Sequence, residues 1–129
     1  MPDEAPKPRG MPVVLLVDDE PLLLASLGHE LQETCKLFTA QSAAEADLRL
    51  AARRYDVIVS DHMLPGEQGL DFLMRAMEMV PSTRRILMTG YTNPEFISRS
   101  MSLAGLSACL VKPLRASDIA GAVREALAS

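Results

Sequence analysis

The sequence predicts an α/β fold, in which a doubly wound parallel sheet of five strands is flanked by five helices. Short apolar runs alternate with longer segments of helical period, and five such alternations follow one another. Three of the runs are apolar enough for strands that are buried on both faces, as in a parallel sheet. The 129 residues suffice for one compact domain and leave no room for a second.

The expected strands are short and differ in character. Residues 13–17, 56–60 and 84–88 are the most apolar, which favours central strands. Residues 36–40 alternate more and suit an outer strand, and residues 107–111 complete the set. Right-handed crossovers between these strands would leave the chemistry of the protein outside their carboxyl ends.

The expected helices lie near residues 21–33, 43–53, 68–79, 94–104 and 116–128. Their start signals include Pro21 and Pro94 in a first turn and a capping box of Ser42 with Glu45, while Gly105 suits a left-handed end of the fourth helix. The helical period assigns these inward faces: Leu23, Leu27 and Leu31; Ala44, Leu48 and Ala51; Phe72, Leu73, Ala76 and Met77; Ile119, Val123 and Leu127.

Composition and charge exclude several classes of protein. The net charge of −4 argues against direct binding to nucleic acid. The apolar runs are too short for a membrane span of about 20 residues, and no secretory leader is recognisable. Cys35 and Cys109 are isolated, which is typical of reduced cysteines in a cytoplasmic protein. Residues 1–12 hold four of the nine prolines and predict a flexible leader before a domain at residues 13–129.

Polar residues follow four of the expected strands. They are Asp18, Asp19 and Glu20 after the first, Asp61 after the third, Thr89 and Gly90 after the fourth, and Lys112 and Pro113 after the fifth. Parallel strands bring all of these to one edge of the sheet. Crowded carboxylates repel one another unless a cation lies among them, and oxygen ligands with open positions suit Mg²⁺ better than zinc.

Lys112 and Thr89 extend this pattern toward phosphoryl chemistry. An ammonium group and Mg²⁺ would neutralise a phosphoryl group, while a hydroxyl and backbone N–H groups would hydrogen-bond its oxygens. A carboxylate can itself act as the nucleophile and form an aspartyl phosphate. Asp61 is the best candidate because it is single, ends a central strand and precedes an open loop.

Four segments in order resemble receiver domains of two-component response regulators: VDDEP at 17–21, SDHMLPGEQGLDFL at 60–73, MTGY at 88–91 and VKPL at 111–114. The resemblance covers essentially everything past residue 12 and implies a flavodoxin-like fold of receiver type with strand order 2-1-3-4-5. It implies that Asp61 accepts the phosphoryl group and that Asp19, Asp61 and the main-chain carbonyl of Met63 bind Mg²⁺. Asp18 would act mainly through metal-bound water.

The same resemblance implies roles for the opposite side of the site. Lys112 would pair with the phosphoryl oxygens across a cis bond to Pro113, and the hydroxyl of Thr89 would move inward on phosphorylation. The backbone N–H groups of Met63 and Gly90 would be further donors to the phosphoryl group.

The implied partners are a histidine kinase or a histidine phosphotransfer protein as donor, and an unknown downstream protein or a fused output domain as target. Switching would act on the surface of the fourth helix, fifth strand and fifth helix, which is also the expected homodimer surface. We expect a cytoplasmic signalling switch that catalyses only its own phosphorylation and dephosphorylation. A phosphatase of the haloacid dehalogenase kind and a binding module without phosphorylation are the alternatives.

Three features of the sequence allow more than one interpretation. The side chain of His62 is expected to point away from that of Asp61, in a solvent-facing or packing role rather than as a second phosphoacceptor or metal ligand. Cys109 occupies a position where many receivers carry Tyr or Phe, and Tyr91 is an alternative aromatic signal. Residues 22–24 are three consecutive leucines that span about 200° of a helix, so at least one is expected to be exposed for a partner or half-buried against a loop.

Overall fold

A five-stranded parallel sheet forms the centre of the computed structural model, which describes residues 10–128. Its strands are β1 (Val13–Val17), β2 (Lys36–Ala40), β3 (Val57–Asp61), β6 (Arg84–Thr89) and β7 (Ala108–Val111). The order across the sheet is β2-β1-β3-β6-β7. This topology confirms the predicted strand order and places the alternating run at residues 36–40 on an edge. The flexible leader falls largely on residues 1–9, which lie outside the described residues, so it stays a prediction.

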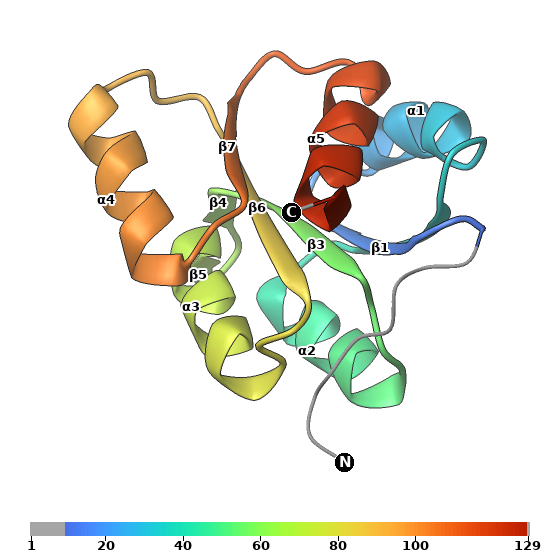
Figure 1. The fold of residues 1–129 in the computed structure, drawn as a ribbon, viewed down its shortest axis with the longest axis horizontal. Coiled ribbons are helices and arrows are strands. Elements are labelled where there is room, and N and C mark those ends of the chain that lie inside the picture. The colour runs from blue at the N-terminus through green and yellow to red at the C-terminus, as the bar shows by residue number, and fades with distance from the viewer. Residues whose placement is uncertain (1–9, 129) are drawn as a thin grey trace.

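Helices cover both faces of the sheet (Figure 1). They are α1 (Pro21–Leu31), α2 (Ala43–Ala52), α3 (Gly69–Met79), α4 (Pro94–Ala104) and α5 (Ala116–Ala128). The predicted start and stop signals are present: Ser42 accepts a hydrogen bond from the N–H of Glu45, and Gly105 ends α4 with a φ of 55°. No helix within residues 10–128 is long and apolar enough to cross a membrane.

Alternation along the strands builds two separate cores. In β1, Val14 and Leu16 face α1 and α5, whereas Leu15 and Val17 face α2 and α3. The strands β1, β3 and β6 are almost fully buried because helices cover them on both sides. These central strands therefore give rigid support to whatever side chains follow their carboxyl ends.

The inward face predicted for α2 is wrong. Ala44, Leu48 and Ala51 are exposed, Leu48 to 72 %, and the buried residues are Ala43 and Ala46 instead. Both faces of this helix carry small apolar residues, so spacing alone did not distinguish the inward face from the outward one. Ala43 and Ala46 are the residues that pack into the core against the sheet. On α1 the correction is smaller: Leu24 is buried and Leu23 only partly so, while Leu27 and Leu31 are buried as predicted.

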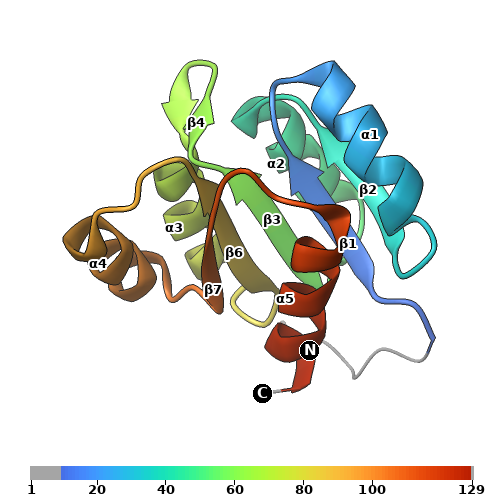
Figure 2. The same ribbon diagram turned by 90° about the horizontal axis from the view of Figure 1, so that it is seen from above.

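A short hairpin was not predicted. It consists of β4 (Met63–Leu64) and β5 (Glu67–Gln68), turns at Gly66 with a φ of 77°, and projects beyond the end of β3 (Figure 2). The guanidinium of Arg75 on α3 holds it, with an N–O distance of 2.6 Å to Glu67. The hairpin thus fixes the path of the chain directly after Asp61.

Candidate functional site

Three carboxylates converge at the carboxyl end of the sheet. One oxygen atom from each of Asp18, Asp19 and Asp61 lies within 4.8 Å of the others. Asp18 is fully buried, Asp19 is exposed and Asp61 is 7 % exposed. The donor set consists of oxygen atoms alone and is open on the side of Asp19, which fits a hard divalent cation such as Mg²⁺.

The backbone fixes the two buried carboxylates. The N–H of Asp18 donates to the carbonyl of Ala40 at 3.0 Å, and its Oδ1 accepts from the N–H of Glu20 at 3.0 Å. Asp61 is the last residue of β3 and lies opposite Met88 of β6 in the strand register. Its side chain is therefore mounted on a central strand, as the sequence predicted.

Gly69 explains how the chain turns so tightly behind Asp61. Its N–H donates to the carbonyl of His62 at 2.8 Å, and a Cβ atom at position 69 would overlap the carbonyl oxygen of Asp61. Only glycine allows α3 to begin at this distance from the strand end. Substitution here would displace the backbone that carries the Asp61 carboxylate.

Lys112 joins the carboxylates from the other side of the site. Its Nζ lies 2.8 Å from Oδ1 of Asp61 and 3.4 Å from Oδ2 of Asp18. Its backbone N–H donates to the carbonyl of Thr89 at 2.7 Å, and the bond to Pro113 is cis, as the resemblance implied. Burial acts to lower the pKa of Lys112, but the hydrogen bond and charge of Asp61, together with Asp18, raise it above its usual value.

Asp61 itself experiences opposing influences. Burial raises the pKa of its carboxyl, while the hydrogen bond and charge of Lys112 act to lower it; the net direction is upward. Two hydrogen-bond contacts, from Lys112 Nζ and from the N–H of His62 at 2.9 Å, fall on Oδ1. Oδ2 is the oxygen that neither contact occupies.

Thr89 ends β6 beside this cluster and is fully buried. Its Oγ1 lies 3.1 Å from Nδ1 of His62 and accepts the N–H of Tyr91 at 3.0 Å. The hydroxyl predicted to respond to a phosphoryl group is therefore already engaged. The structure brings together Asp18, Asp19, Asp61, Thr89 and Lys112 at one rim, with Met63 and Gly90 in the segments that directly follow β3 and β6.

His62 is buried, with 4 % of its surface exposed, so the packing role predicted for it is confirmed and the solvent-facing one is wrong. Its ring contacts Tyr91 at 4.8 Å and Phe96 at 4.7 Å between centroids, and burial lowers its pKa against the opposing influence of Asp61. Sequence reasoning missed its contact with Thr89. A usable signal existed, since both residues lie at the ends of strands predicted to be neighbours.

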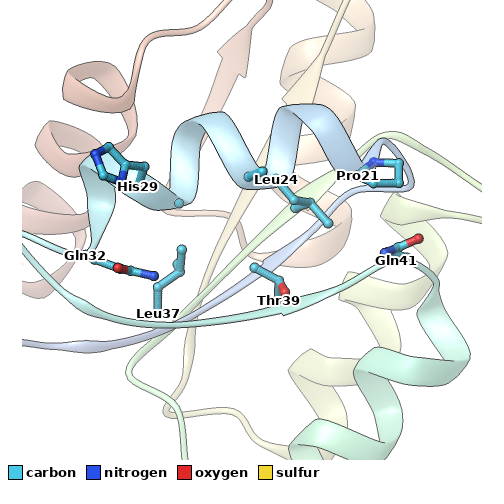
Figure 3. Close-up of a pocket in the computed structure, with 9 residues that line it drawn as sticks. Pro21, Leu24, His29, Gln32, Leu37, Thr39 and Gln41 are labelled. Carbon is cyan, nitrogen blue, oxygen red and sulfur yellow. The ribbon is translucent and has the colours of Figure 1, made fainter.

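A surface groove of about 460 Å³ lies apart from this site, between α1 and the edge strand β2. Figure 3 shows Leu24 and His29 on the helix side and Leu37 and Thr39 on the strand side. None of the predicted site residues lines it. Of the three consecutive leucines, Leu22 is the exposed one, at 86 % of its surface, in the first turn of α1.

Comparisons with known proteins agree with the fold. Residues 14–124 match the response regulator receiver domain. The hydrogenase transcriptional regulatory protein HoxA of Cupriavidus necator is 34 % identical over 88 % of the chain, which spans 24 % of that protein. The DNA-binding transcriptional activator DevR/DosR of Mycobacterium tuberculosis is 33 % identical over 87 % of the chain, which spans 52 % of that protein.

Solved structures give the same result. The signal receiver domain of an HD domain-containing protein from Pseudomonas fluorescens Pf-5 superposes with a TM-score of 0.83 at 32 % identity, over 92 % of this chain and 95 % of that one. The chain thus spans a quarter to a half of the two regulators and nearly the whole of an isolated receiver domain. It belongs to the family of response regulator receiver domains, whose members are phosphorylated on an aspartate in two-component signalling.

Proposed function

We propose that this receiver domain is a cytoplasmic signalling switch in which Asp61 accepts a phosphoryl group from a histidine kinase or a histidine phosphotransfer protein. The observation that carries the proposal is the position of Lys112 Nζ, 2.8 Å from Asp61 and 3.4 Å from Asp18, next to a third carboxylate. A cation among three carboxylates at a strand end suits a site that gains and loses a phosphoryl group.

Oδ2 of Asp61 is the proposed nucleophile, because Lys112 and the N–H of His62 both contact Oδ1. The O–P bond forms as the P–N bond of the phosphohistidine donor breaks, and the donor ring leaves with that electron pair. Lys112 neutralises charge on the transferring group, and the N–H groups of Met63 and Gly90 are proposed as additional donors to its oxygens.

Asp19, Asp61 and the main-chain carbonyl of Met63 are proposed to hold Mg²⁺, with Asp18 acting through a metal-bound water. When bound, the ion neutralises the phosphoryl oxygens and orients them for in-line transfer. The oxygen-only donor set supports this assignment. Three carboxylates face one lysine at this rim, so a divalent cation also relieves their mutual repulsion.

The proposed partners use two different surfaces. Leu22, exposed in the first turn of α1 and close in sequence to Asp18 and Asp19, is a candidate contact for the phosphoryl donor. The surface of α4, β7 and α5, which includes the half-buried Cys109, is the candidate for a downstream protein, an output domain or a second copy.

Trapping with beryllium fluoride, which mimics a phosphoryl group on a carboxylate, tests the proposal. In the wild-type protein with Mg²⁺, we expect amide NMR shifts around the strand ends and on α4. Asp61→Asn should show no response, and Asp71→Asn, which alters an exposed carboxylate on α3, should respond like the wild type. An equal response in Asp61→Asn would contradict the assignment.

The phosphatase alternative makes a separate prediction. That family needs two aspartates two residues apart after the first strand, with the nucleophile first, whereas Asp18 and Asp19 are adjacent and Asp61 is the last residue of β3, the third strand along the chain. Multiple turnover on a free phosphate ester would favour the enzyme, whereas phosphorylation of the chain without turnover of the ester favours the switch.

A further inference from the structure

We propose that His62 is a positioning residue that holds the hydroxyl of Thr89 in the unphosphorylated protein. When this hydroxyl is released, the His62 ring shifts and changes its packing against α4. The inference rests on the proposed phosphorylation of Asp61 and adds to it a residue that acts through Thr89. It also assigns a chemical role to an imidazole that the phosphoryl-transfer step does not use.

The contact between the two side chains is built into the strand ends. The N–H of His62 is shared between Oδ1 of Asp61 and the carbonyl of Met88, and its 2.8 Å bond to Met88 places the residue beside the end of β6. Nδ1 then lies 3.1 Å from Oγ1 of Thr89, and both residues are buried. Because water has little access to either group, releasing the hydroxyl requires another partner for it.

The tautomer of the His62 ring decides which of the two groups donates. The Thr89 hydroxyl has one proton, and its oxygen already accepts the N–H of Tyr91 at 3.0 Å. We assign the hydroxyl as donor and an unprotonated Nδ1 of His62 as acceptor, with the ring proton on Nε2. In this arrangement the hydroxyl cannot also donate to a phosphoryl oxygen on Asp61, so one bond must break before the other forms.

The His62 ring also belongs to a cluster of three mutually contacting rings. Its centroid lies 4.8 Å from that of Tyr91 and 4.7 Å from that of Phe96, and Tyr91 and Phe96 are 5.1 Å apart. Phe96 is in the first turn of α4. A shift of the imidazole on losing its contact with Thr89 therefore disturbs the packing of that turn directly.

The tautomer and its change can be measured in the wild-type protein. We expect ¹⁵N NMR to show Nδ1 of His62 unprotonated and hydrogen-bonded in the free protein, with a changed Nδ1 shift after beryllium fluoride and Mg²⁺ bind. A proton on Nδ1 in the free protein, or an Nδ1 shift that binding leaves unchanged, would overturn the proposal. This measurement needs no variant, so it does not depend on how any substitution folds.

A double-mutant cycle isolates the hydrogen bond from general packing. His62→Phe keeps a ring and removes the acceptor, so it should bind beryllium fluoride about 2- to 13-fold more tightly, the equivalent of one net hydrogen bond. In a Thr89→Ala background the same change should have no effect on affinity. A merely structural role of His62 would give the same effect in both backgrounds and would overturn the inference.

His62→Asn is the conservative variant, since its amide reaches toward the position of Nδ1 but offers no ring. We expect it to restore an affinity near that of the wild type while hydrogen exchange in the first turn of α4 no longer responds to binding. A full response in α4 would contradict the role of the ring. Failure of beryllium fluoride to bind the wild-type protein would contradict the proposed function, whereas binding without a change at His62 contradicts only this inference.

Discussion

The two ends of α4 are held by different kinds of contact. At the carboxyl end, the buried guanidinium of Arg85 donates to the carbonyls of Ala104 at 2.8 Å and Gly105 at 3.1 Å. At the amino end, the Asn93 side chain caps the helix, and Phe96 packs against the rings of His62 and Tyr91. Directional hydrogen bonds from a buried cation fix one end, whereas ring contacts that can slide hold the end beside the site.

This difference indicates which part of α4 can respond to Asp61. Local stability follows buried apolar contacts and protected hydrogen bonds, so the two ends need not open together. The amino end contacts the ring of His62, which in turn contacts the hydroxyl of Thr89, and the carboxyl end lies a full helix away. We expect phosphorylation to move the amino end about a carboxyl end that stays in place.

Arg85→Met should give the largest effect. It would leave the carbonyls of the buried residues Ala104 and Thr83, and that of Gly105, without the guanidinium that now donates to them, at a cost of about 3 kcal/mol in the free energy of unfolding. Urea unfolding measures this, with Arg124→Met on the exposed side of α5 as the matched control, expected within about 0.5 kcal/mol of the wild type. A loss below about 1 kcal/mol for Arg85→Met would mean that the carboxyl end is not fixed in this way.

Phe96→Ala should cost less, about 1–2 kcal/mol, because the ring is only half-buried. Faster hydrogen exchange should be confined to the first turns of α4, with the end at Ala104 still protected. Leu103→Ala, at an exposed position of the same helix, serves as control. Equal loosening along the whole helix would remove the distinction between its two ends.

Asp61→Asn should stabilise the protein modestly in the absence of Mg²⁺, because burial raises the pKa of this carboxyl and its charged form is disfavoured on folding. The direction of this pKa shift determines how the stability of the protein depends on pH. Between the unfolded value of 3.8 and the higher folded value, the folded state binds the extra proton, so this group adds stability as pH falls through that interval. Thermal unfolding of Asp61→Asn should therefore not show the gain in stability that this group gives the wild type as pH falls.

Adding Mg²⁺ to the wild type and to Asp61→Asn tests the same carboxylate in the opposite direction, because the ion should stabilise the protein that carries it. At ten times its dissociation constant the ion should stabilise the wild type by about 1.4 kcal/mol and leave Asp61→Asn nearly unchanged. Equal stabilisation of both proteins would place the ion elsewhere.

Arg49→Ala should have the smallest effect, below about 0.5 kcal/mol. Arg49 pairs with Glu45 at 3.5 Å on the exposed side of α2, so solvent screens the interaction. Denaturant unfolding of this variant beside Arg85→Met compares an exposed cation with a buried one. A loss of stability for Arg49→Ala close to the loss for Arg85→Met would show that burial does not determine how much a cation contributes to the free energy of unfolding.

Much of the fold could be predicted because the signals are local. Pro94 and Gly105 bound α4 in the structure as predicted, and the apolar runs at 13–17 and 36–40 are strands with unchanged limits. The inward face of α2 could not be predicted, since alanines lie on both sides of that helix and only packing against the sheet selects one.

The candidate site also has features that the sequence predicts and features that it does not. Asp61 ends β3 and Lys112 directly follows β7, so parallel topology alone brings them to one edge. The adjacency of two predicted strand ends indicates that His62 and Thr89 are near each other, but their contact depends on the orientation of the His62 ring, which leaves no pattern in the sequence. Residues whose backbone position decides their role were found, and residues whose rotamer decides it were not.

The most direct measurement maps the phosphorylated residue itself. The wild-type protein is incubated with Mg²⁺ and acetyl phosphate and then treated with borohydride, which reduces an aspartyl phosphate to homoserine that mass spectrometry locates in the peptides. We predict homoserine at position 61 alone, and none in Asp61→Asn. Homoserine at Asp18 or Asp19 instead, or a phosphoryl group on the intact protein without any homoserine, would contradict the assignment of Asp61 as phosphoacceptor.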